Sequence, residues 1–293
     1  MAAARTAIAA LMFAATGGRA LAQDDVPFIT TPDRVTTAML ELAGVTARDH
    51  VLDLGSGDGR IVITAARRFG ASGLGVEIVP DLVKRSREHA RAAGVEGRVE
   101  FREQDLFATD LSRATVVTMY LLPEVNLQLR PRLLALAPGT RIVSHDWDLG
   151  DWQPERTLTL DVPDKTIGRE KTSRVHLWVV PAQVHGTWCA ANARLVVTQR
   201  FQRFSASLER RGGGSAAATS ATTTAGAPPA PIVVFDGRID GAELRTEAPL
   251  TTPARLRYEV RAGAAPVLQI QQIGGVAAEH AGRTFTRAAA SDC

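Results

Sequence analysis

An apolar strand that runs directly into a glycine-rich loop is the feature that most restricts the fold of this chain. Residues 51–59 have the sequence VLDLGSGDG. Glycine at alternate positions lets the backbone turn tightly and approach a ligand closely, because no side chain intervenes. Residues 60–69 then predict a helix, whose first amides attract polar groups of a ligand. The sequence therefore predicts a strand, a loop and a helix that together hold a nucleotide-like molecule.

The spacing of the glycines distinguishes between kinds of nucleotide. A dinucleotide-binding loop follows the pattern G-x-G-x-x-G, and its third glycine would fall at Arg60. NAD and FAD are therefore disfavoured. The pattern that fits is D-x-G-x-G-x-G, in which Asp53 ends the strand and faces an amino-acid moiety while the glycines pass under a nucleoside. A strand, turn and helix without any ligand is the alternative.

This motif resembles motif I of the class I S-adenosylmethionine (SAM) dependent methyltransferases. The resemblance implies that SAM is the cofactor. It also implies contacts to SAM from four residues of the loop and the preceding strand, Asp53, Gly55, Ser56 and Gly57.

The segments after the loop extend this resemblance. Residues 73–78 predict a second strand with Glu77 at its carboxyl end, and an acid about 20 residues beyond such a loop can accept hydrogen bonds from ribose hydroxyls. A solvated charge at the end of a strand is the alternative for Glu77. A helix over 80–93 and a third strand over 99–102 are expected next. The resemblance then places Asp105 beside the adenine amino group.

The chain from residue 114 onward narrows the resemblance. Residues 114–129 begin as a β-branched strand and continue into a helix, and residues 138–145 predict a turn and a fifth strand. These segments resemble the disruptor-of-telomeric-silencing histone lysine methyltransferases and the mitochondrial enzymes that modify the adenine nucleotide translocase and the ATP synthase c subunit. The resemblance covers about residues 26–180. It implies an α/β fold, a Rossmann-like seven-stranded methyltransferase sheet with helices on both faces.

Two features argue against nucleic acid as the substrate. The Asn-Pro-Pro-Tyr element with which amino methyltransferases hold a nucleic-acid base is absent from the sequence. The net charge of +3 is too diffuse to indicate a nucleic-acid groove, which needs clustered charge on one face. The chain also departs from the histone enzymes, because Met119-Tyr120-Leu121-Leu122 replaces their paired asparagines.

Methyl transfer requires a nucleophile with a free lone pair aligned on the methyl group, so positioning and exclusion of water supply most of the rate. A lysine ammonium must first lose its proton. Tyr120 and Glu124, after the fourth strand, are predicted to frame the acceptor. In the alternative, Tyr120 only packs and Glu124 only complements a helix dipole. The fifth strand is followed by His145, Asp146 and Trp147, which could line the same acceptor site. The sequence has no cluster of metal-ligating residues at a recognisable spacing, so no metal is expected.

The segment before the glycine loop predicts an amphipathic helix that ends near Gly44. Thr31 is expected to cap this helix, with Pro32 at its first position. In the family such a segment closes over SAM, so the resemblance implies Thr31 and Phe28 as further cofactor contacts. A hydrophobic staple is the alternative for Phe28.

The two ends of the chain differ from residues 23–181, the expected methyltransferase domain. Residues 1–22 combine an early arginine, a short apolar run and Ala-Leu-Ala, which predicts a signal peptide and a periplasmic or secreted mature chain without a transmembrane span. An alanine-rich cytosolic leader is the alternative. Because SAM is made in the cytosol, export leaves the supply of SAM unexplained.

Residues 182–293 alternate in short strands and predict a small, partly irregular β-rich domain. Within it, Asp236-Gly237 is a hairpin signal. Residues 211–231 consist of Gly, Ser, Ala, Thr and Pro apart from their first arginine, and are expected to form a disordered insert. Cys189 and Cys293 could pair in an oxidising compartment.

Together these patterns predict transfer of a methyl group from SAM to an acceptor, with a protein lysine amine as the leading candidate. Two alternatives stay open: an exported SAM-fold binding module without turnover, and a methyltransferase that acts on a small molecule. The intact Asp53, Gly55, Gly57 and Glu77 favour SAM binding and do not identify the acceptor. The sequence does not fix the oligomeric state.

Overall fold

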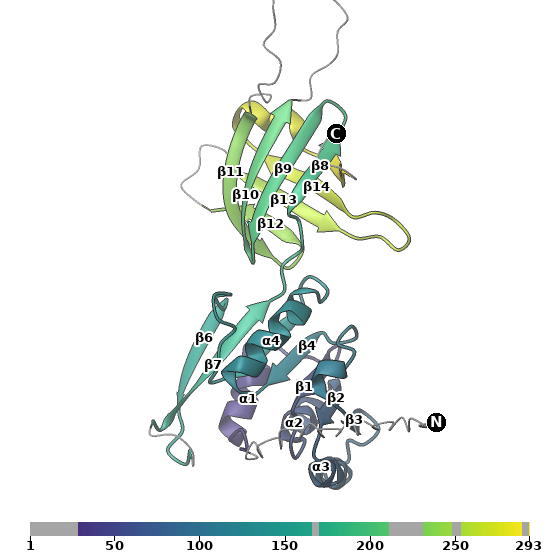
Figure 1. Ribbon diagram of the computed structural model, residues 1–293, viewed down its shortest axis with the longest axis vertical. Coiled ribbons are helices and arrows are strands. Elements are labelled where there is room, and N and C mark those ends of the chain that lie inside the picture. Colours follow the sequence, from purple (N-terminus) through teal and green to yellow (C-terminus); the bar gives the residue numbers. More distant parts are fainter. Residues whose placement is uncertain (1–28, 166–169, 211–230, 248–252, 289–292) are drawn as a thin grey trace, which may run out of the picture.

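The computed structural model describes residues 29–165, 170–210, 231–247, 253–288 and 293. These residues form an α/β unit followed by a second unit made of strands (Figure 1). The expected signal peptide, Phe28 and all but the last residue of the expected insert lie outside the described residues. Within the described part of the chain, none of the helices is both long and apolar enough to cross a bilayer.

The α/β unit contains a seven-stranded sheet in the order β3-β2-β1-β4-β5-β7-β6. Its strands are β1 (His50–Leu54), β2 (Ser72–Glu77), β3 (Val99–Glu103), β4 (Val116–Met119), β5 (Arg141–His145), β6 (Arg156–Asp161) and β7 (Thr172–Val179). The first five strands of this order pair in parallel, and β7 is antiparallel to both β5 and β6. The strand order reverses next to β1, and ligands bind at such a point outside the carboxyl ends of the strands. The seven-stranded sheet that the family resemblance implies is confirmed.

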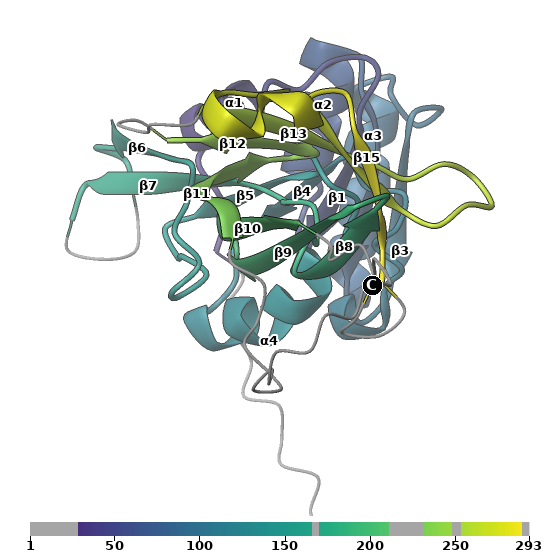
Figure 2. The same ribbon diagram turned by 90° about the horizontal axis from the view of Figure 1, so that it is seen from above.

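Helices cover both faces of this sheet, as expected. They are α1 (Asp33–Leu42), α2 (Arg60–Phe69), α3 (Pro80–Ala92) and α4 (Pro123–Leu134). Helices α1 and α2 pack on one face, where Met39 and Ile61 join a buried cluster with Val51 of β1. Helix α4 packs on the other face through Leu129 and Leu133 (Figure 2). Because the glycine loop leads into α2, packing of α2 fixes the loop against the sheet.

The prediction that Thr31 caps α1 is wrong. The helix begins at Asp33, and its N-cap is Pro32, which makes no side-chain capping bond. Pro32 is in an extended conformation with ψ of 147°, so the helix starts one residue later than the sequence pattern indicates. Thr31 is buried, and its Oγ1 lies 3.2 Å from Nδ1 of His145 at the end of β5.

The second unit is a closed barrel of eight antiparallel strands, and not the small irregular domain expected. Its strands are β8 (Gly186–Ala190), β9 (Ala193–Arg200), β10 (Arg203–Arg210), β11 (Pro231–Asp240), β12 (Glu243–Thr246), β13 (Ala254–Glu259), β14 (Val267–Ile273) and β15 (Thr284–Arg287). Each strand pairs with the next along the chain, and β15 pairs with β8 to close the barrel. Side chains fill its interior, with Trp188, Phe235 and Phe285 at most 1% exposed.

The hairpin predicted at Asp236-Gly237 is also wrong, because both residues lie inside β11 and pair with β10. A Cβ atom on Gly237 would overlap with the carbonyl oxygen of Arg245 on β12. This glycine therefore allows two backbones to approach closely, which is the other common role of glycine within strands. The turn falls instead after Asp240, at Gly241.

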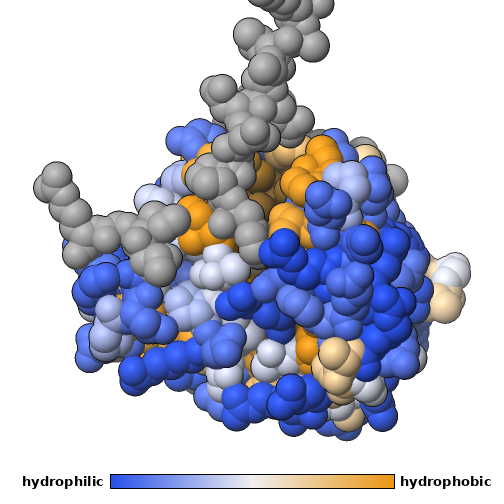
Figure 3. Space-filling view, turned by 90° about the horizontal axis from the view of Figure 1, so that it is seen from below, coloured by the Kyte–Doolittle hydropathy of each residue, from blue (hydrophilic) through white to orange (hydrophobic). Residues whose placement is uncertain are grey.

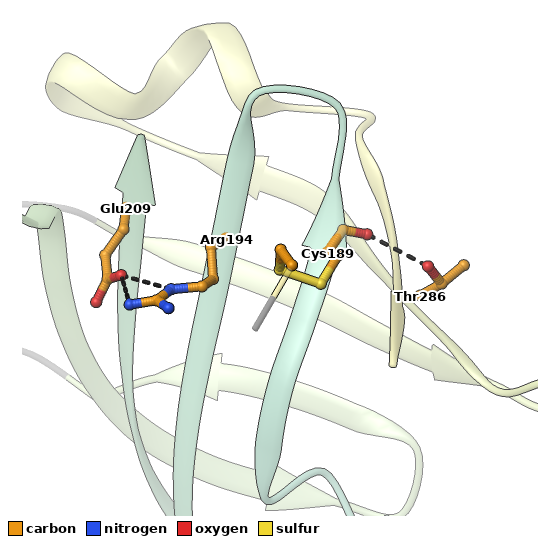
Figure 4. The surroundings of a disulfide bond; sticks show 5 residues. Cys189, Arg194, Glu209 and Thr286 are labelled. Carbon is orange, nitrogen blue, oxygen red and sulfur yellow. Dashed lines mark hydrogen bonds and ion pairs between the residues drawn. A yellow bond between two sulfur atoms is a disulfide. The ribbon is translucent and has the colours of Figure 1, made fainter. Parts of the chain in front are cut away.

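A disulfide bond joins Cys189 of β8 to Cys293 (Figure 4). Next to it, the hydroxyl of Thr286 on β15 donates a hydrogen bond of 3.4 Å to the carbonyl oxygen of Cys189. The disulfide therefore ties the end of the chain to the pair of strands that closes the barrel.

The barrel contacts the α/β unit at the amino end of β5. In the register of β5 and β7, Arg141 pairs with Val179, so the end of β7 leads toward the barrel at the amino end of β5. Across this junction, Glu155 forms an ion pair with Arg238 and the ring of Phe201 stacks on Trp152 at 6.1 Å. The carboxyl ends of the parallel strands consequently point away from the barrel (Figure 1).

Candidate functional site

The glycine loop after β1 is hydrogen-bonded to the carboxyl end of β2. It lies at the end of the sheet that is remote from the barrel. Gly55 and Gly57 have φ angles of +74° and +53°, which residues with a side chain rarely adopt. The amides of Gly55 and Ser56 both donate to the carbonyl oxygen of Val76, at 3.0 and 2.9 Å. A Cβ atom on Gly55 would lie 2.9 Å from the Leu121 side chain. Positive φ and close packing together require glycine in this loop.

Glu77 is held at the end of β2 by three backbone amides. Its Oε2 accepts a 2.9 Å hydrogen bond from the amide of Gly57, and its Oε1 accepts from the amides of Ile78 and Val79 at 2.8 and 3.1 Å. A carboxylate has about four acceptor positions. One position on Oε2 is therefore left for a ligand hydroxyl, and binding of two ribose hydroxyls would require one of the amides to be released.

Asp53 is a buried carboxylate beneath the loop, 2% exposed. Its Oδ1 accepts a 2.7 Å hydrogen bond from the hydroxyl of Thr118 on β4. Burial, together with the negative charges of Glu77 and Asp58, raises the pKa of Asp53 to about 7, although the hydrogen bond from Thr118 acts in the opposite direction. A cationic group bound here would favour the ionised carboxylate. The site is thus suited to the α-ammonium group at the amino-acid end of SAM.

We expect the affinity for SAM to depend on the ionisation of Asp53. Below pH 7 the carboxyl is mostly protonated and cannot pair with a cation, so affinity should rise as the pH is raised through 7. A single group with a pKa of about 7 predicts a rise of roughly eightfold between pH 6 and pH 7.5. Isothermal titration calorimetry of the wild type and of Asp53→Asn measures this difference.

The comparison with Asp53→Asn removes the titration of SAM itself, which both proteins share. The variant should bind SAM more weakly, and its affinity should change with pH only as much as SAM's own titration requires. The same pH profile in both proteins would contradict the assignment of Asp53 to the cationic end of SAM.

Asp58 and Arg60 connect the loop to the segment before α1, and the sequence pattern did not single out this pair. Asp58 is buried and accepts hydrogen bonds from Nη2 and Nε of Arg60 at 2.7 and 3.0 Å. Nη1 of Arg60 also donates to the carbonyl oxygen of Thr31 at 2.9 Å. Arg60, at the position of the third glycine of a dinucleotide loop, therefore fixes Thr31 near the carboxyl end of β5. The region between the glycine loop and the residues that follow β2, β4 and β5 is called the crevice below, because ligands of such sheets bind at this place.

Asp105 lies at the end of β3, where its side chain is exposed to solvent. Its Oδ1 accepts a 2.7 Å hydrogen bond from the amide of Phe107 and so caps the short helix Leu106–Ala108. This bond fixes the direction of the carboxylate. The proposed adenine contact of Asp105 remains a prediction, as does the cofactor contact of Thr31.

Exposed hydrophobic side chains surround this end of the sheet. Figure 3 views the molecule from this end and shows hydrophobic patches on its surface. Five of the large exposed residues follow the ends of β2, β3, β4 and β5: Ile78, Val79, Phe107, Leu122 and Trp147. Such a rim favours a ligand or partner with apolar surface.

Tyr120 follows β4 and is joined to residues after β5. Its hydroxyl lies 3.5 Å from Oδ2 of Asp146, and its ring lies 3.9 Å from the ring of His145. Burial and the charge of Asp146 raise the pKa of Tyr120 to about 12, so the phenol stays protonated at neutral pH. Glu124 is exposed in the first turn of α4, where its charge complements the helix dipole. The structure therefore brings Tyr120 into contact with Asp146. The role of Glu124 in framing the acceptor remains a prediction.

His145 and Asp146 form a fixed pair at the end of β5. His145 is 1% exposed, and its Nε2 lies 2.9 Å from the hydroxyl of Ser173 on β7. Burial lowers the pKa of His145 to about 4, so the ring is neutral at physiological pH. Asp146 has a φ of +62°, and its Oδ1 accepts a 3.0 Å hydrogen bond from the amide of Arg174. Unusual backbone angles of this kind are concentrated at functional sites.

The crevice fits SAM in its donor and acceptor groups. Asp53 offers a carboxylate to a cation, Glu77 offers an acceptor to a hydroxyl, and the glycine loop offers side-chain-free backbone. Within the described residues, the buried hydroxyl of Ser56 has no hydrogen-bond partner. This oxygen lies close to Gly75 of β2, so the contact that Ser56 is expected to make with SAM comes from its backbone.

Comparisons with known proteins agree with this arrangement. A family model for the ANTKMT methyltransferase domain matches residues 53–156. A protein-lysine N-methyltransferase from Saccharolobus islandicus is 43% identical over 138 residues, which cover 46% of this chain and 86% of that relative. The adenine nucleotide translocase lysine N-methyltransferase of Mus musculus is 39% identical over 36% of this chain and 46% of its own length. The chain thus spans most of the archaeal relative and less than half of the mouse one.

One solved structure with high identity is described as an RNA methyltransferase from Salinibacter ruber in complex with S-adenosyl-L-homocysteine. It is 52% identical and covers 53% of this chain and 96% of that chain, with a TM-score of 0.49.

Proposed function

The chain belongs to the family of SAM-dependent protein-lysine N-methyltransferases, and on this premise we propose that it transfers the methyl group of SAM to the ε-amine of a lysine in a partner protein. The observation that carries the proposal is the 43% identity that extends over 86% of the archaeal lysine methyltransferase. The carboxylates of Asp53 and Glu77 and the glycine loop, all at the carboxyl ends of the parallel strands, also support the proposal. The small-molecule acceptor and the inactive binding module are the less favoured alternatives.

In this proposal the residues of the crevice each hold one part of the cofactor. When bound, SAM supplies a methyl group made electrophilic by the adjacent positive sulfur. Asp53 pairs with the amino-acid end, Glu77 accepts a hydrogen bond from the ribose, and Asp105 lies beside the adenine. Gly55, Ser56 and Gly57 contribute backbone on which the nucleoside lies. Thr31, fixed by Arg60, closes the crevice from the segment before α1.

The residues after β4 and β5 would orient the acceptor. A phenol with a pKa of about 12 does not act as a base at neutral pH, so Tyr120 orients the amine through its hydroxyl. The neutral ring of His145 packs against the Tyr120 ring at 3.9 Å and so helps to fix its position. Asp146, whose carboxylate pKa is lowered despite its burial, offers a negative charge near the reacting nitrogen. Glu124 lies further out, on the first turn of α4.

Tyr120→Phe should reduce turnover more than cofactor affinity. Removal of the hydroxyl leaves the ring in place and takes away the group expected to orient the acceptor amine. We expect kcat to fall by about tenfold, as is typical of a single lost positioning hydrogen bond, while the Kd for SAM stays within about twofold. The chain has one other tyrosine, Tyr258 in the barrel, and Tyr258→Phe is the matched control. Equal kinetics in the wild type and Tyr120→Phe would remove Tyr120 from the acceptor site.

The proposed activity is tested with the purified mature chain, methyl-labelled SAM and a mixture of cellular proteins. Label should appear in protein as N-methyllysine, identified by mass spectrometry after digestion. Parallel reactions contain RNA or small amines in place of protein. Label confined to RNA or to small amines, or absence of SAM binding, would contradict the proposal.

We further propose that the mature chain functions outside the cytosol. The features of residues 1–22 and the disulfide between Cys189 and Cys293 support this location, because disulfides persist in oxidising compartments. A chain that keeps residues 1–22 and is recovered in the cytosolic fraction would contradict export.

A further inference from the structure

The ammonium group of Lys165 is held at the acceptor side of the crevice. Its Nζ donates hydrogen bonds to Oδ2 of Asp146 at 2.8 Å and to the carbonyl oxygen of Thr172 at 2.7 Å. The side chain is 14% exposed. The chain has two other lysines, Lys84 and Lys171, and both are exposed. One lysine of three is therefore withdrawn from solvent, and it is the one beside Tyr120 and Asp146.

The groups around Lys165 form a fixed receptor for a primary ammonium. The amide of Arg174 holds Oδ1 of Asp146, which leaves Oδ2 to face the cation. The Tyr120 hydroxyl lies 3.5 Å from the same Oδ2. An ammonium has three donors, and Asp146 and Thr172 satisfy two of them. The receptor thus combines the charge of Asp146, the carbonyl oxygen of Thr172 and the hydroxyl of Tyr120.

We propose that Asp146, the carbonyl oxygen of Thr172 and the hydroxyl of Tyr120 form the subsite for the ammonium group of the acceptor lysine, and that Lys165 fills this subsite when no acceptor is bound. The inference rests on the proposed lysine methyltransferase function and adds to it a residue that recognises the acceptor. Its basis is the juxtaposition of a bound ammonium with two residues that follow β4 and β5, the strands whose carboxyl ends border the crevice.

An internal occupant lowers the apparent affinity for the acceptor. The acceptor binds only to molecules from which Lys165 has withdrawn, so the measured affinity is reduced by the fraction of such molecules. Lys165 precedes β7, and its replacement leaves the hydrogen bond from the amide of Arg174 to Asp146 in place. Substitution of Lys165 is therefore expected to free the subsite without dismantling it.

The kinetic test uses a synthetic peptide with one lysine among alanines as the acceptor. We expect Lys165→Met to lower the KM for this peptide by about tenfold, the effect of an occupant present in about nine molecules of ten. Lys165→Arg restores the cation and should return KM toward the wild-type value. Lys84→Met, on the exposed face of α3, removes a lysine elsewhere and should leave KM unchanged. An unchanged or raised KM in Lys165→Met would overturn the proposal.

A binding test separates this inference from the proposed function, because it requires no turnover. The protein is saturated with S-adenosylhomocysteine and titrated calorimetrically with n-butylamine at neutral pH, where this mimic of a lysine side chain is a cation. Lys165→Met should bind the amine, and the double variant Lys165→Met, Asp146→Asn should not. Binding to both variants, or to neither, would show that Asp146 does not form the subsite, whether or not the protein methylates lysine.

Discussion

Gly57→Val should abolish measurable SAM binding while both folded units remain intact. Gly57 has a φ of +53°, and a β-branched residue is a severe outlier at such an angle. The loop must therefore change its path, which breaks the hydrogen bond from the Gly57 amide to Glu77. The new side chain also occupies the space in which backbone is expected to meet the ligand. We expect a loss of affinity of about 100-fold or more, from combined strain and lost contacts.

Gly44→Val is the matched control for this variant. Gly44 has a similar φ of +62° in the turn after α1, and a Cβ atom added there has no neighbour within 4 Å. This control carries the same backbone strain but does not touch the crevice, so it should lose some thermal stability and keep its affinity for SAM. Calorimetric titration and thermal melting of both variants distinguish the two effects. Affinity of Gly57→Val within threefold of the wild type would refute the assigned crevice.

Cys293→Ser should destabilise the barrel and leave the methyltransferase crevice unaffected. The lost bond joins residues 104 positions apart in the sequence, and in the chain-entropy account a long loop gives a large stabilisation. We expect the free energy of unfolding of the barrel to fall by about 2 to 5 kcal/mol. Affinity for SAM should not change, because Cys189 lies on β8 and the crevice lies at the edge of the sheet remote from the barrel.

Reduction of the wild-type protein provides the control for this prediction. A reducing agent should lower the denaturation midpoint of the wild type to that of Cys293→Ser, and the variant should not respond to the reagent. Denaturant unfolding is followed by tryptophan fluorescence, in which the buried Trp188 reports on the barrel. The other three tryptophans lie in the α/β unit, and their fluorescence change is assigned to the unfolding of that unit. The same denaturation midpoint of the barrel in Cys293→Ser and in the oxidised wild type would contradict the prediction.

The α/β unit was predictable from the sequence because its signals are local. The glycine loop, the helix over 60–69 and the acid that ends β2 each depend on residues close together in the chain. The expected helix over 80–93 differs from α3 by one residue. Packing then placed these strands in one seven-stranded sheet, as the family resemblance implied.

The parts that could not be predicted depend on contacts between distant residues. Thr118 supports Asp53 across 65 positions, and Lys165 reaches Asp146 across 19. Neither contact has a sequence signature, because each is set by the pairing of strands. The barrel was missed for the same reason, since its closure depends on β15 returning to β8. Gly237 shows the converse error, in which a local turn signal was overridden by the approach of β12.

The barrel is attached at the amino end of β5, so it leaves the opposite end of the sheet uncovered. Substitutions on the outer surface of the barrel should therefore leave the affinity for SAM unchanged, and the two units of the chain can be engineered separately.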